Sequence, residues 1–296
     1  MSRPPQPLQF RLPSAPDHPQ SEDAMKSRLS FVFTLAGLLA ATQPVGADVL
    51  ADVKKAGELK IGTETEFAPF DYVDAGDHVG FNVDLFNEVG KELGVKIGWI
   101  ALPWAGVLPG LETKKFDMVA GPAVITKARM ERYAYSAPIA DGTVTLVKRA
   151  NDDSIQKPED IAGKAIGGAR SSSQLAQMKA FAETLNPQPT VREYVGVNEA
   201  SSDLAAGRIA AIAQSLPSGT FAAKRRPDTF AVVMPPFGEK AYFGYMFRKD
   251  ADSASLLDAV NEVIDRMKAD GRLAAMQTKW FGVVFETPDR VTDPAL

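Results

Sequence analysis

The stretch from Asp117 to Pro138 contains the residue with the clearest chemical potential, Arg129. An apolar run, a Gly-Pro pair and Thr126 follow one another there, which predicts a buried strand, a turn and the N-cap of a helix. Arg129 would then lie in the first helical turn, near the carboxyl end of the strand, where ligands gather in open α/β sheets. Its planar guanidinium could bind a carboxylate there. Taken alone, the simpler interpretation is an arginine that solvates a helix start.

Aromatic and hydroxyl side chains occupy comparable positions. Phe67 and Trp104 are both expected in loops that follow strands, where their rings could stack on a planar or apolar ligand. The alternative, that they are core residues, stays open. Ser172 and Ser173 are expected at the start of a helix, whose N–H groups and dipole favour an anion. Simple N-capping explains these two serines equally well.

Several kinds of active site lack the side chains that they need. The chain has no cysteine and two histidines, of which His18 precedes the expected cleavage site and only His78 follows it. Serine–histidine and cysteine–histidine catalysis and Cys/His zinc sites are therefore excluded. The stretches Gly80–Asn82 and Gly167–Gly168 have neither the spacing nor the lysine of a phosphate loop.

The remaining charged residues indicate no active site. Carboxylate pairs such as Asp71 and Asp74 are expected to be solvated turn residues. The formal net charge of −4 offers no basic field for nucleic acid. With no catalytic residue, metal site or cofactor in sight, the pattern favours a binding module.

Strands that alternate with short helices must position these residues, and they predict an α/β fold with mostly parallel sheets. The length of 296 residues is enough for two domains, and a second α/β block is expected from about Asn151. A cleft between the two blocks is the default place for a ligand. Strands are expected at 59–63, 95–101, 143–147, 164–168, 191–195, 209–213, 230–234 and 242–248, and helices at 82–93, 107–114, 171–184, 199–206, 219–224, 256–268 and 271–280.

The N-terminal segment predicts export. Residues 1–24 are rich in Pro, Gln and Ser, which is typical of disorder, and Met25 is expected to be the true start. Residues 25–47 combine basic residues, an apolar run and small residues, the layout of a secretory signal peptide cleaved after Ala47. The run is shorter than the roughly 20 residues that a membrane-spanning helix needs. Without a cysteine to carry a lipid, the mature protein is expected to be soluble in the periplasm.

A series of segments in this order resembles the extracellular solute-binding proteins of polar amino-acid ABC transporters, family 3, which include lysine/arginine/ornithine-, histidine- and glutamine-binding proteins. The resemblance spans about Leu59 to Gly282, and Trp104 is one of the residues within this range that carry it. The segments that carry it are IGTETEFAPFDY, VGFNVDLFNEVGKELG, FDMVAGPAVITKARMERYAYSAP, LAAGRIAAI, GYMFRKD, VNEVIDRMKADGRL and TKWFG.

The resemblance implies two α/β lobes, joined by two hinge strands, that close over a ligand. Lobe one would comprise residues 48–142 and 241–285, lobe two residues 143–240, and residues 286–296 would form a C-terminal tail. It also implies a monomer that receives a small carboxylate and delivers it to an ABC permease in the inner membrane.

The resemblance further implies a role for each candidate site residue that matches the family pattern. The rings of Phe67 and Trp104 would flank the ligand, and Arg129 would bind its α-carboxylate. Backbone N–H groups at Ser172 and Ser173 would assist from lobe two.

Other positions depart from the family pattern. The family usually has serine or threonine where this chain has Gly121, Pro122 and Val124, and an acidic residue that holds the ligand's ammonium where this chain has Ser215. Losing that carboxylate forgoes a charge-assisted hydrogen bond worth roughly 1.5–3 kcal/mol. We therefore expect a small carboxylate whose ammonium is modified, distant or absent, with Glu64 available to a distal cation.

Two alternatives belong to other functional classes. Some relatives of this fold are cyclohexadienyl-dehydratase-like enzymes, which need a general acid in the cleft, and Glu64 is the only acid expected there. A sensor-type ligand-binding domain is the third interpretation. The leading expectation remains a binding protein and not an enzyme.

Overall fold

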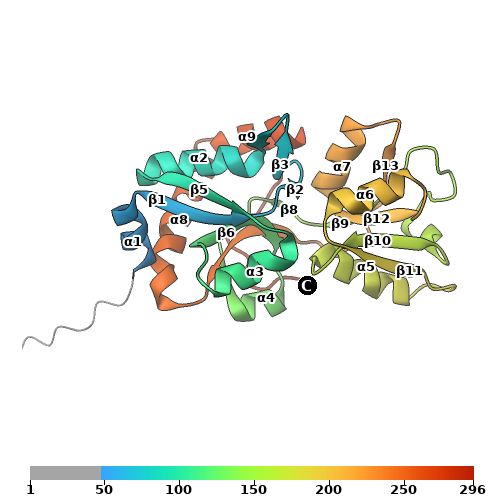
Figure 1. Ribbon diagram of the computed structural model, residues 1–296, viewed down its shortest axis with the longest axis horizontal. Helices are drawn as coiled ribbons and strands as arrows, with labels where there is room; N and C mark the ends of the chain where they lie inside the picture. The colour runs from blue at the N-terminus through green and yellow to red at the C-terminus, as the bar shows by residue number, and fades with distance from the viewer. Residues whose placement is uncertain (1–47) are drawn as a thin grey trace, which may run out of the picture. The chain divides into compact units, whose positions relative to one another are not determined.

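The computed structural model describes residues 48–296, so the expected signal peptide at 25–47 and the leading segment 1–24 lie outside the described residues. Two sheets, each with its own helices, lie beside one another in Figure 1. We call the six-stranded sheet with its helices lobe one, and the five-stranded sheet with its helices lobe two. None of the helices within 48–296 has the length and apolar character needed to cross a bilayer.

Lobe one contains strands in the order β5-β1-β6-β14-β7, with β8 also paired to β14. Helices α1, α2, α8 and α9 pack on one face of this sheet, and α3 packs on the other. Strand β6 is consequently buried at every position, as expected for a strand covered on both faces. The elements are α1 (Val49–Ala56), β1 (Glu58–Thr63), α2 (Phe81–Leu93), β5 (Lys96–Ala101), α3 (Trp104–Glu112), β6 (Met118–Val124), α4 (Lys127–Arg132), β7 (Tyr133–Tyr135), β8 (Ala140–Asp141), β14 (Tyr242–Arg248), α8 (Ala251–Ala269) and α9 (Arg272–Phe281).

Lobe two contains strands in the order β11-β10-β12-β9-β13. Helix α5 packs on one face, and α6 and α7 pack on the other. The elements are β9 (Val144–Arg149), the 3-10 helix η1 (Pro158–Ile161), β10 (Ala165–Ala169), α5 (Ser173–Glu183), β11 (Thr190–Tyr194), α6 (Val197–Ala205), β12 (Ala211–Ser215), α7 (Leu216–Arg225) and β13 (Phe230–Val233).

The α/β fold is the expected one, but both sheets are mixed. Parallel pairing joins β1 to β5 and β6, and β10 to β11 and β12. The strands next to the two crossings between the lobes run antiparallel to their neighbours, because β9 and β14 each enter a sheet from the other lobe. The chain crosses from β8 to β9 and returns from β13 to β14, which gives two crossings.

A small three-stranded sheet projects from lobe one toward lobe two (Figure 1). It consists of β2 (Glu66–Phe67), β3 (Asp71–Asp74) and β4 (Asp77–Val79), and we call it the hairpin sheet. Asp74 forms an ion pair with Arg225 of α7 at 3.3 Å. The ring of Tyr72 lies 5.7 Å from that of Phe221, also in α7. The hairpin sheet therefore contacts lobe two directly.

The expectation that Asp71 is a solvated turn residue is wrong. Its side chain is fully buried. One carboxylate oxygen accepts a hydrogen bond from Asn82 Nδ2 at 2.5 Å, and the other is hydrogen-bonded to His78 Nε2 at 2.7 Å. Asn82 also donates to Ala120 O at 2.6 Å and accepts from the hydroxyl of Tyr245 at 2.8 Å. Asn82 lies in the first turn of α2, and Gly80 occupies the N-cap position.

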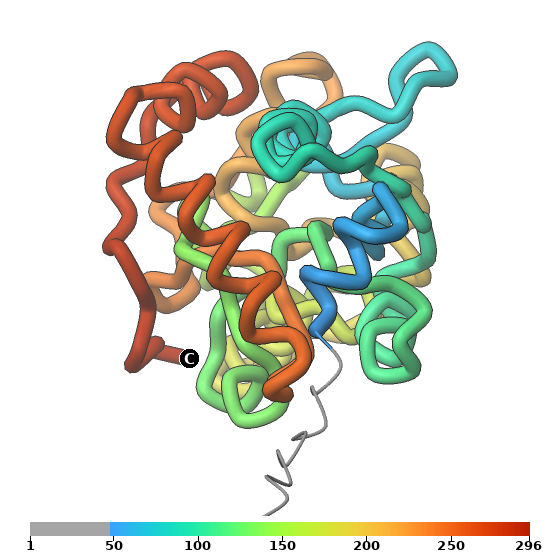
Figure 2. The backbone as a smooth tube through the Cα atoms, turned by 90° about the vertical axis from the view of Figure 1, so that its left-hand side faces the viewer, coloured from blue at the N-terminus to red at the C-terminus, as the bar shows by residue number. Residues whose placement is uncertain are grey.

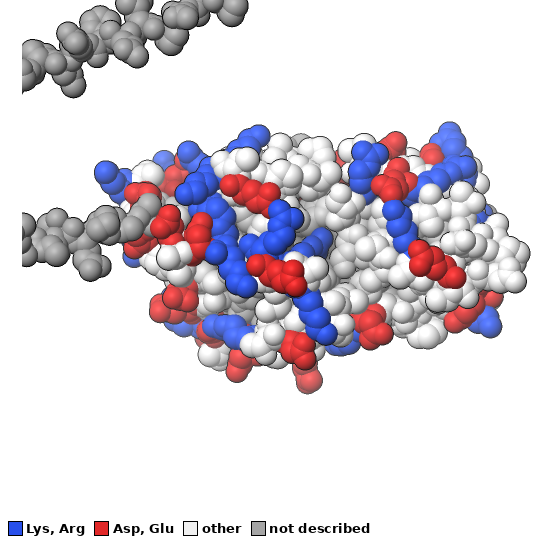
Figure 3. All heavy atoms as spheres, turned by 90° about the horizontal axis from the view of Figure 1, so that it is seen from below, with Lys and Arg blue, Asp and Glu red and all other residues white. Residues whose placement is uncertain are grey.

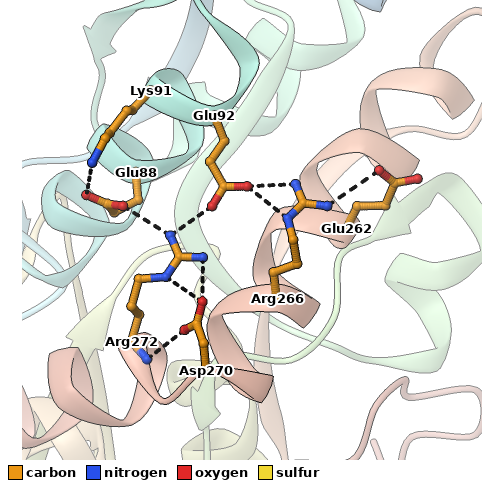
Figure 4. Close-up of polar contacts among 7 residues, drawn as sticks. All are labelled: Glu88, Lys91, Glu92, Glu262, Arg266, Asp270 and Arg272. Atoms are coloured by element: carbon orange, nitrogen blue, oxygen red, sulfur yellow. Dashed lines mark hydrogen bonds and ion pairs between the residues drawn. The ribbon is translucent and has the colours of Figure 1, made fainter.

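An ion-pair cluster joins α2 to the turn between α8 and α9 (Figure 4). Arg266 donates two hydrogen bonds to Glu92, at 2.7 and 2.9 Å, and Arg272 bonds Glu88, Glu92 and Asp270. The cluster connects segments far apart in the sequence.

The C-terminal segment after α9 runs back along lobe one (Figure 2). Arg290 pairs with Asp265 of α8 at 2.8 Å, and the hydroxyl of Thr287 bonds Pro138 O at 3.3 Å. The face seen in Figure 3 carries acidic and basic side chains interspersed, without a broad field of one sign.

Candidate ligand-binding site

A pocket between the two lobes collects most of the predicted site residues. Seven of the nine predicted site residues line it. Pro122, which departs from the family pattern, lines it as well. They come from the ends of strands in lobe one, from α3 and α4, and from the start of α5 in lobe two. The seven are Glu64, Phe67, Trp104, Val124, Arg129, Ser172 and Ser173.

Arg129 is held in place by its own helix start. Thr126 caps α4 as predicted, accepting a hydrogen bond from Arg129 N at 3.3 Å. The guanidinium donates to Val124 O at 3.1 Å and lies 5.7 Å from the ring centre of Trp104. No ion pair within residues 48–296 involves Arg129. A positioned cation without a carboxylate partner is what an anionic ligand requires.

The two aromatic residues are both buried and part of the pocket wall. Trp104 is the first residue of α3 and does not lie in a loop as expected. Its indole N–H donates to Ser171 O of lobe two at 3.2 Å. Phe67 belongs to β2, and its ring stacks on Phe70 at 5.3 Å and meets Phe243 edge-on at 5.7 Å. Phe67 is therefore a core residue that also faces the pocket.

The start of α5 offers a ligand its backbone N–H groups, whereas the Ser172 hydroxyl is used within the protein. Ser172 is the N-cap, and its hydroxyl accepts from Leu175 N at 3.1 Å and donates to Ala169 O at 2.7 Å. The hydroxyl is thus occupied by capping. The next two N–H groups, of Ser173 and Gln174, lie where no preceding helical turn accepts them, so they are available to a ligand anion.

Two predicted residues do not line the pocket. Gly121 is not among the lining residues, and a Cβ added there would lie 3.4 Å from the Trp104 ring. Ser215 is fully buried, and its hydroxyl caps α7 and bonds Ser218 Oγ at 3.0 Å. The preceding residue, Gln214, lines the pocket instead. Its signal in the sequence is a polar residue near the end of the otherwise apolar strand 211–215.

The pocket wall carries two charged residues, Glu64 and Arg129, both from lobe one. Burial, together with nearby Asp71 and Glu66, raises the pKa of Glu64 to about 8. Glu64 is half-buried, and the protein around it disfavours the charged carboxylate because water solvates it less than in the unfolded chain. At neutral pH the Glu64 side chain is therefore predominantly a neutral carboxylic acid.

Metal-binding geometry is absent from residues 48–296, where no three His, Asp or Glu side chains gather around one point. The only histidine in this range, His78, bonds Asp71 and is not among the pocket residues.

The chain matches the family model described as bacterial extracellular solute-binding proteins, family 3, over residues 59–283. The L-cystine-binding protein TcyJ of Escherichia coli strain K12 is 31% identical over 236 residues, covering 79% of this chain and 86% of that protein. The lysine/arginine/ornithine-binding periplasmic protein of the same strain is 31% identical over 231 residues, covering 75% and 87%.

A solved structure has a similar fold. An ancestral arginine-binding protein bound to arginine has a TM-score of 0.70 and 30% identity, covering 76% of this chain and 99% of its own. The family match across most of the chain and these relatives show that the protein belongs to the bacterial extracellular solute-binding proteins of family 3.

Proposed function

We propose that this protein captures a small carboxylate-bearing solute, an amino acid or an amino-acid derivative, between its two lobes and delivers it to an ABC importer. Its named relatives are binding proteins for L-cystine and for lysine, arginine and ornithine. The protein acts as a binding protein and not as an enzyme, in keeping with those relatives.

The observation that carries this proposal is the environment of Arg129. Its guanidinium is fixed by Val124 O and lies beside the Trp104 ring, with no carboxylate of the described residues paired to it. The free N–H groups at the start of α5 line the same pocket from lobe two. A ligand carboxylate between them would hold both lobes together, and its contacts to both would favour the closed form.

The chemistry of the pocket wall suggests what lies next to that carboxylate. Lobe two presents no acidic side chain to the pocket, and Ser215, where the family resemblance implies an acid, caps α7. We propose a ligand whose ammonium is modified, distant or absent. Glu64 would receive a distal cation, since an approaching positive charge favours the ionised carboxyl.

We propose that closure is a hinge motion of lobe one, residues 48–142 and 241–285, against lobe two, residues 143–240, about the two crossings. The tail 286–296 would move with lobe one, to which its contacts belong. The mature protein would act as a monomer in the periplasm, after removal of the signal peptide, and dock on a permease of the inner membrane.

Calorimetric titration of the mature protein with a panel of amino acids and N-acylated derivatives tests the proposal. For any ligand that binds, Arg129→Ala should weaken affinity by at least about thirtyfold, because losing a buried charge-assisted contact costs roughly 2–5 kcal/mol. Arg132→Ala is the matched control. It removes a cation from the same helix that pairs with Glu112 at 2.5 Å outside the pocket. Equal effects of the two substitutions would contradict the proposed role of Arg129.

A further inference from the structure

Two glutamine amides of lobe two face the pocket without partners. Gln214 and Gln174 are 4% and 8% exposed, and both line the pocket. Neither side-chain amide makes a hydrogen bond to another residue within 48–296. The fully buried unpaired side-chain atoms of the described residues belong to other residues, so the amide atoms of Gln174 and Gln214 stay accessible from the pocket. Both amides can therefore bond a polar ligand group. An amide both donates and accepts, and it therefore complements another amide.

The pocket around Arg129 is small. Its volume is about 30 Å³, which accommodates about two water molecules. A larger cavity of about 380 Å³ adjoins it, and Phe67, Val197 and Gln214 line both. We call this larger cavity the second chamber. Its volume falls within the range of about 300–1,000 Å³ that is typical of small-molecule sites.

Aromatic rings and an arginine line the second chamber, which is open to solvent on the side of the half-exposed Asp74 and Arg225. Tyr72 of the hairpin sheet and Phe221 of α7 both line it, and their ring centres are 5.7 Å apart. The guanidinium of Arg225 lies within 6 Å of both ring centres and pairs with Asp74. Figure 1 shows the hairpin sheet facing α7 at this place. Such walls suit a planar or apolar group.

From these observations we infer that the ligand is an N-acylated amino acid, with its carboxylate at Arg129, its amide at Gln214 and its acyl group in the second chamber. This inference rests on the proposed function and specifies its ligand class. An acylated nitrogen carries no positive charge, so the ligand does not need the acidic partner that Ser215 replaces. The raised pKa of Glu64, to about 8, supports the same class, because a protonated carboxyl can donate a hydrogen bond to an acyl carbonyl.

Two probes that share a carboxylate and an amide test the inference. N-benzoylglycine carries an aromatic acyl group, and N-acetylglycine carries a methyl. Calorimetric titration should show N-benzoylglycine binding at least about tenfold more tightly, because it buries a phenyl ring in the second chamber. Ser201→Trp, which fills the chamber from α6, should abolish this advantage and retain N-acetylglycine binding.

Ser202→Trp is the matched control, since Ser202 follows on α6, is exposed and does not line the chamber. It should retain the advantage of N-benzoylglycine. If Ser201→Trp does not fold, Gln214→Leu provides the second test and should weaken both probes by about two- to tenfold.

Three results would overturn the inference: equal affinity for the two probes, an advantage that survives Ser201→Trp, or binding of free amino acids without either probe. The last would leave the proposed function intact. If no panel compound binds, or if Arg129→Ala leaves probe affinity unchanged, the proposed function itself fails and the inference fails with it.

Discussion

Glu64 combines a position in the ligand pocket with a protonation state set by its surroundings. Burial contributes most to its raised pKa, followed by Asp71 and then Glu66. A cationic ligand group that reached Glu64 would ionise it and release a proton, whereas a neutral ligand group would not. Proton release on binding therefore reports which kind of group the ligand places there.

The pH dependence of stability provides a test at this residue. The pKa of Glu64 rises from an ordinary value of 4.5 to about 8 on folding, so between these values the folded chain holds a proton that the unfolded chain has lost. The free energy of unfolding should therefore fall as pH rises through this window and level off above it. Glu64→Gln, which cannot ionise, should flatten this profile and be more stable than the parent at pH 9.

Urea denaturation at pH 5 and at pH 9 measures this effect. Glu131→Gln, at an exposed position of α4, is the control and should follow the parent profile. Parent and Glu64→Gln profiles that run parallel from pH 5 to pH 9 would show that Glu64 does not titrate in this range.

Residues whose position is set by a nearby helix start could be predicted from the sequence. Thr126 and Ser172 cap their helices as the pattern indicates, and Arg129 follows from Thr126. Asp71 could not be placed, because its burial depends on Asn82, which lies eleven residues away in α2. Ser215 was expected in the pocket by analogy with relatives, although Ser followed by Leu-Pro is itself a capping pattern.

At the scale of elements, the connection from the hairpin sheet to α2 depends on a close backbone approach. Phe81 N donates to Pro69 O at 2.9 Å, and Asn82 N donates to Phe70 O at 3.0 Å. Gly80, which precedes these two donors, adopts a φ of 142°, and a Cβ there would lie 2.1 Å from Phe70 O. Only glycine fits this place without displacing backbone.

Gly80→Ala should therefore destabilise the protein by on the order of 3 kcal/mol, through strain and loss of this contact. The free energy of unfolding from urea titrations measures the effect. Gly106→Ala in α3 is the matched control, because the nearest atom to its added Cβ is Leu102 Cβ at 3.8 Å. This change should leave stability unchanged or raise it by up to about 1 kcal/mol. Similar losses in both variants would contradict the steric argument.

The elements themselves were largely predictable, and their pairing was less so. Alternation of apolar runs and helical patterns placed β1, β10 and α5 close to their observed bounds. Helix α8 begins at Ala251, five residues before the predicted Leu256, because Asp250 caps it by accepting from Ser253 N at 2.9 Å. The antiparallel direction of β9 and β14 depends on the crossings between lobes, which no local pattern encodes.

At the scale of the whole molecule, contacts between the lobes extend beyond the ligand pocket. The ion pair between Asp74 and Arg225 joins the hairpin sheet to α7, and both side chains are about half exposed. Glu66 Oε2 accepts from Asn198 N of lobe two at 3.4 Å. Such contacts exist only when the lobes are together, so they favour the closed form whatever the ligand.

Asp74→Asn and Arg225→Gln should each lower the affinity by the same small factor for ligands that leave the second chamber empty, such as N-acetylglycine. An exposed ion pair contributes up to about 1 kcal/mol, which corresponds to at most about fivefold. The double variant should resemble either single variant, because both remove one interaction. Titrations at low and high salt measure this, and the effect should shrink at high salt. Factors that differ among ligands that leave the second chamber empty would contradict a contact that acts only through closure.

The sheet order of lobe one has a consequence for how the chain is made. Strand β14, which lies between β6 and β7, comes from residues 242–248, after all the strands of lobe two. While the ribosome is still synthesising lobe two, the first sheet has a vacancy beside β6 that no earlier segment fills. Lobe one can therefore complete its sheet only once nearly the whole polypeptide has been translated.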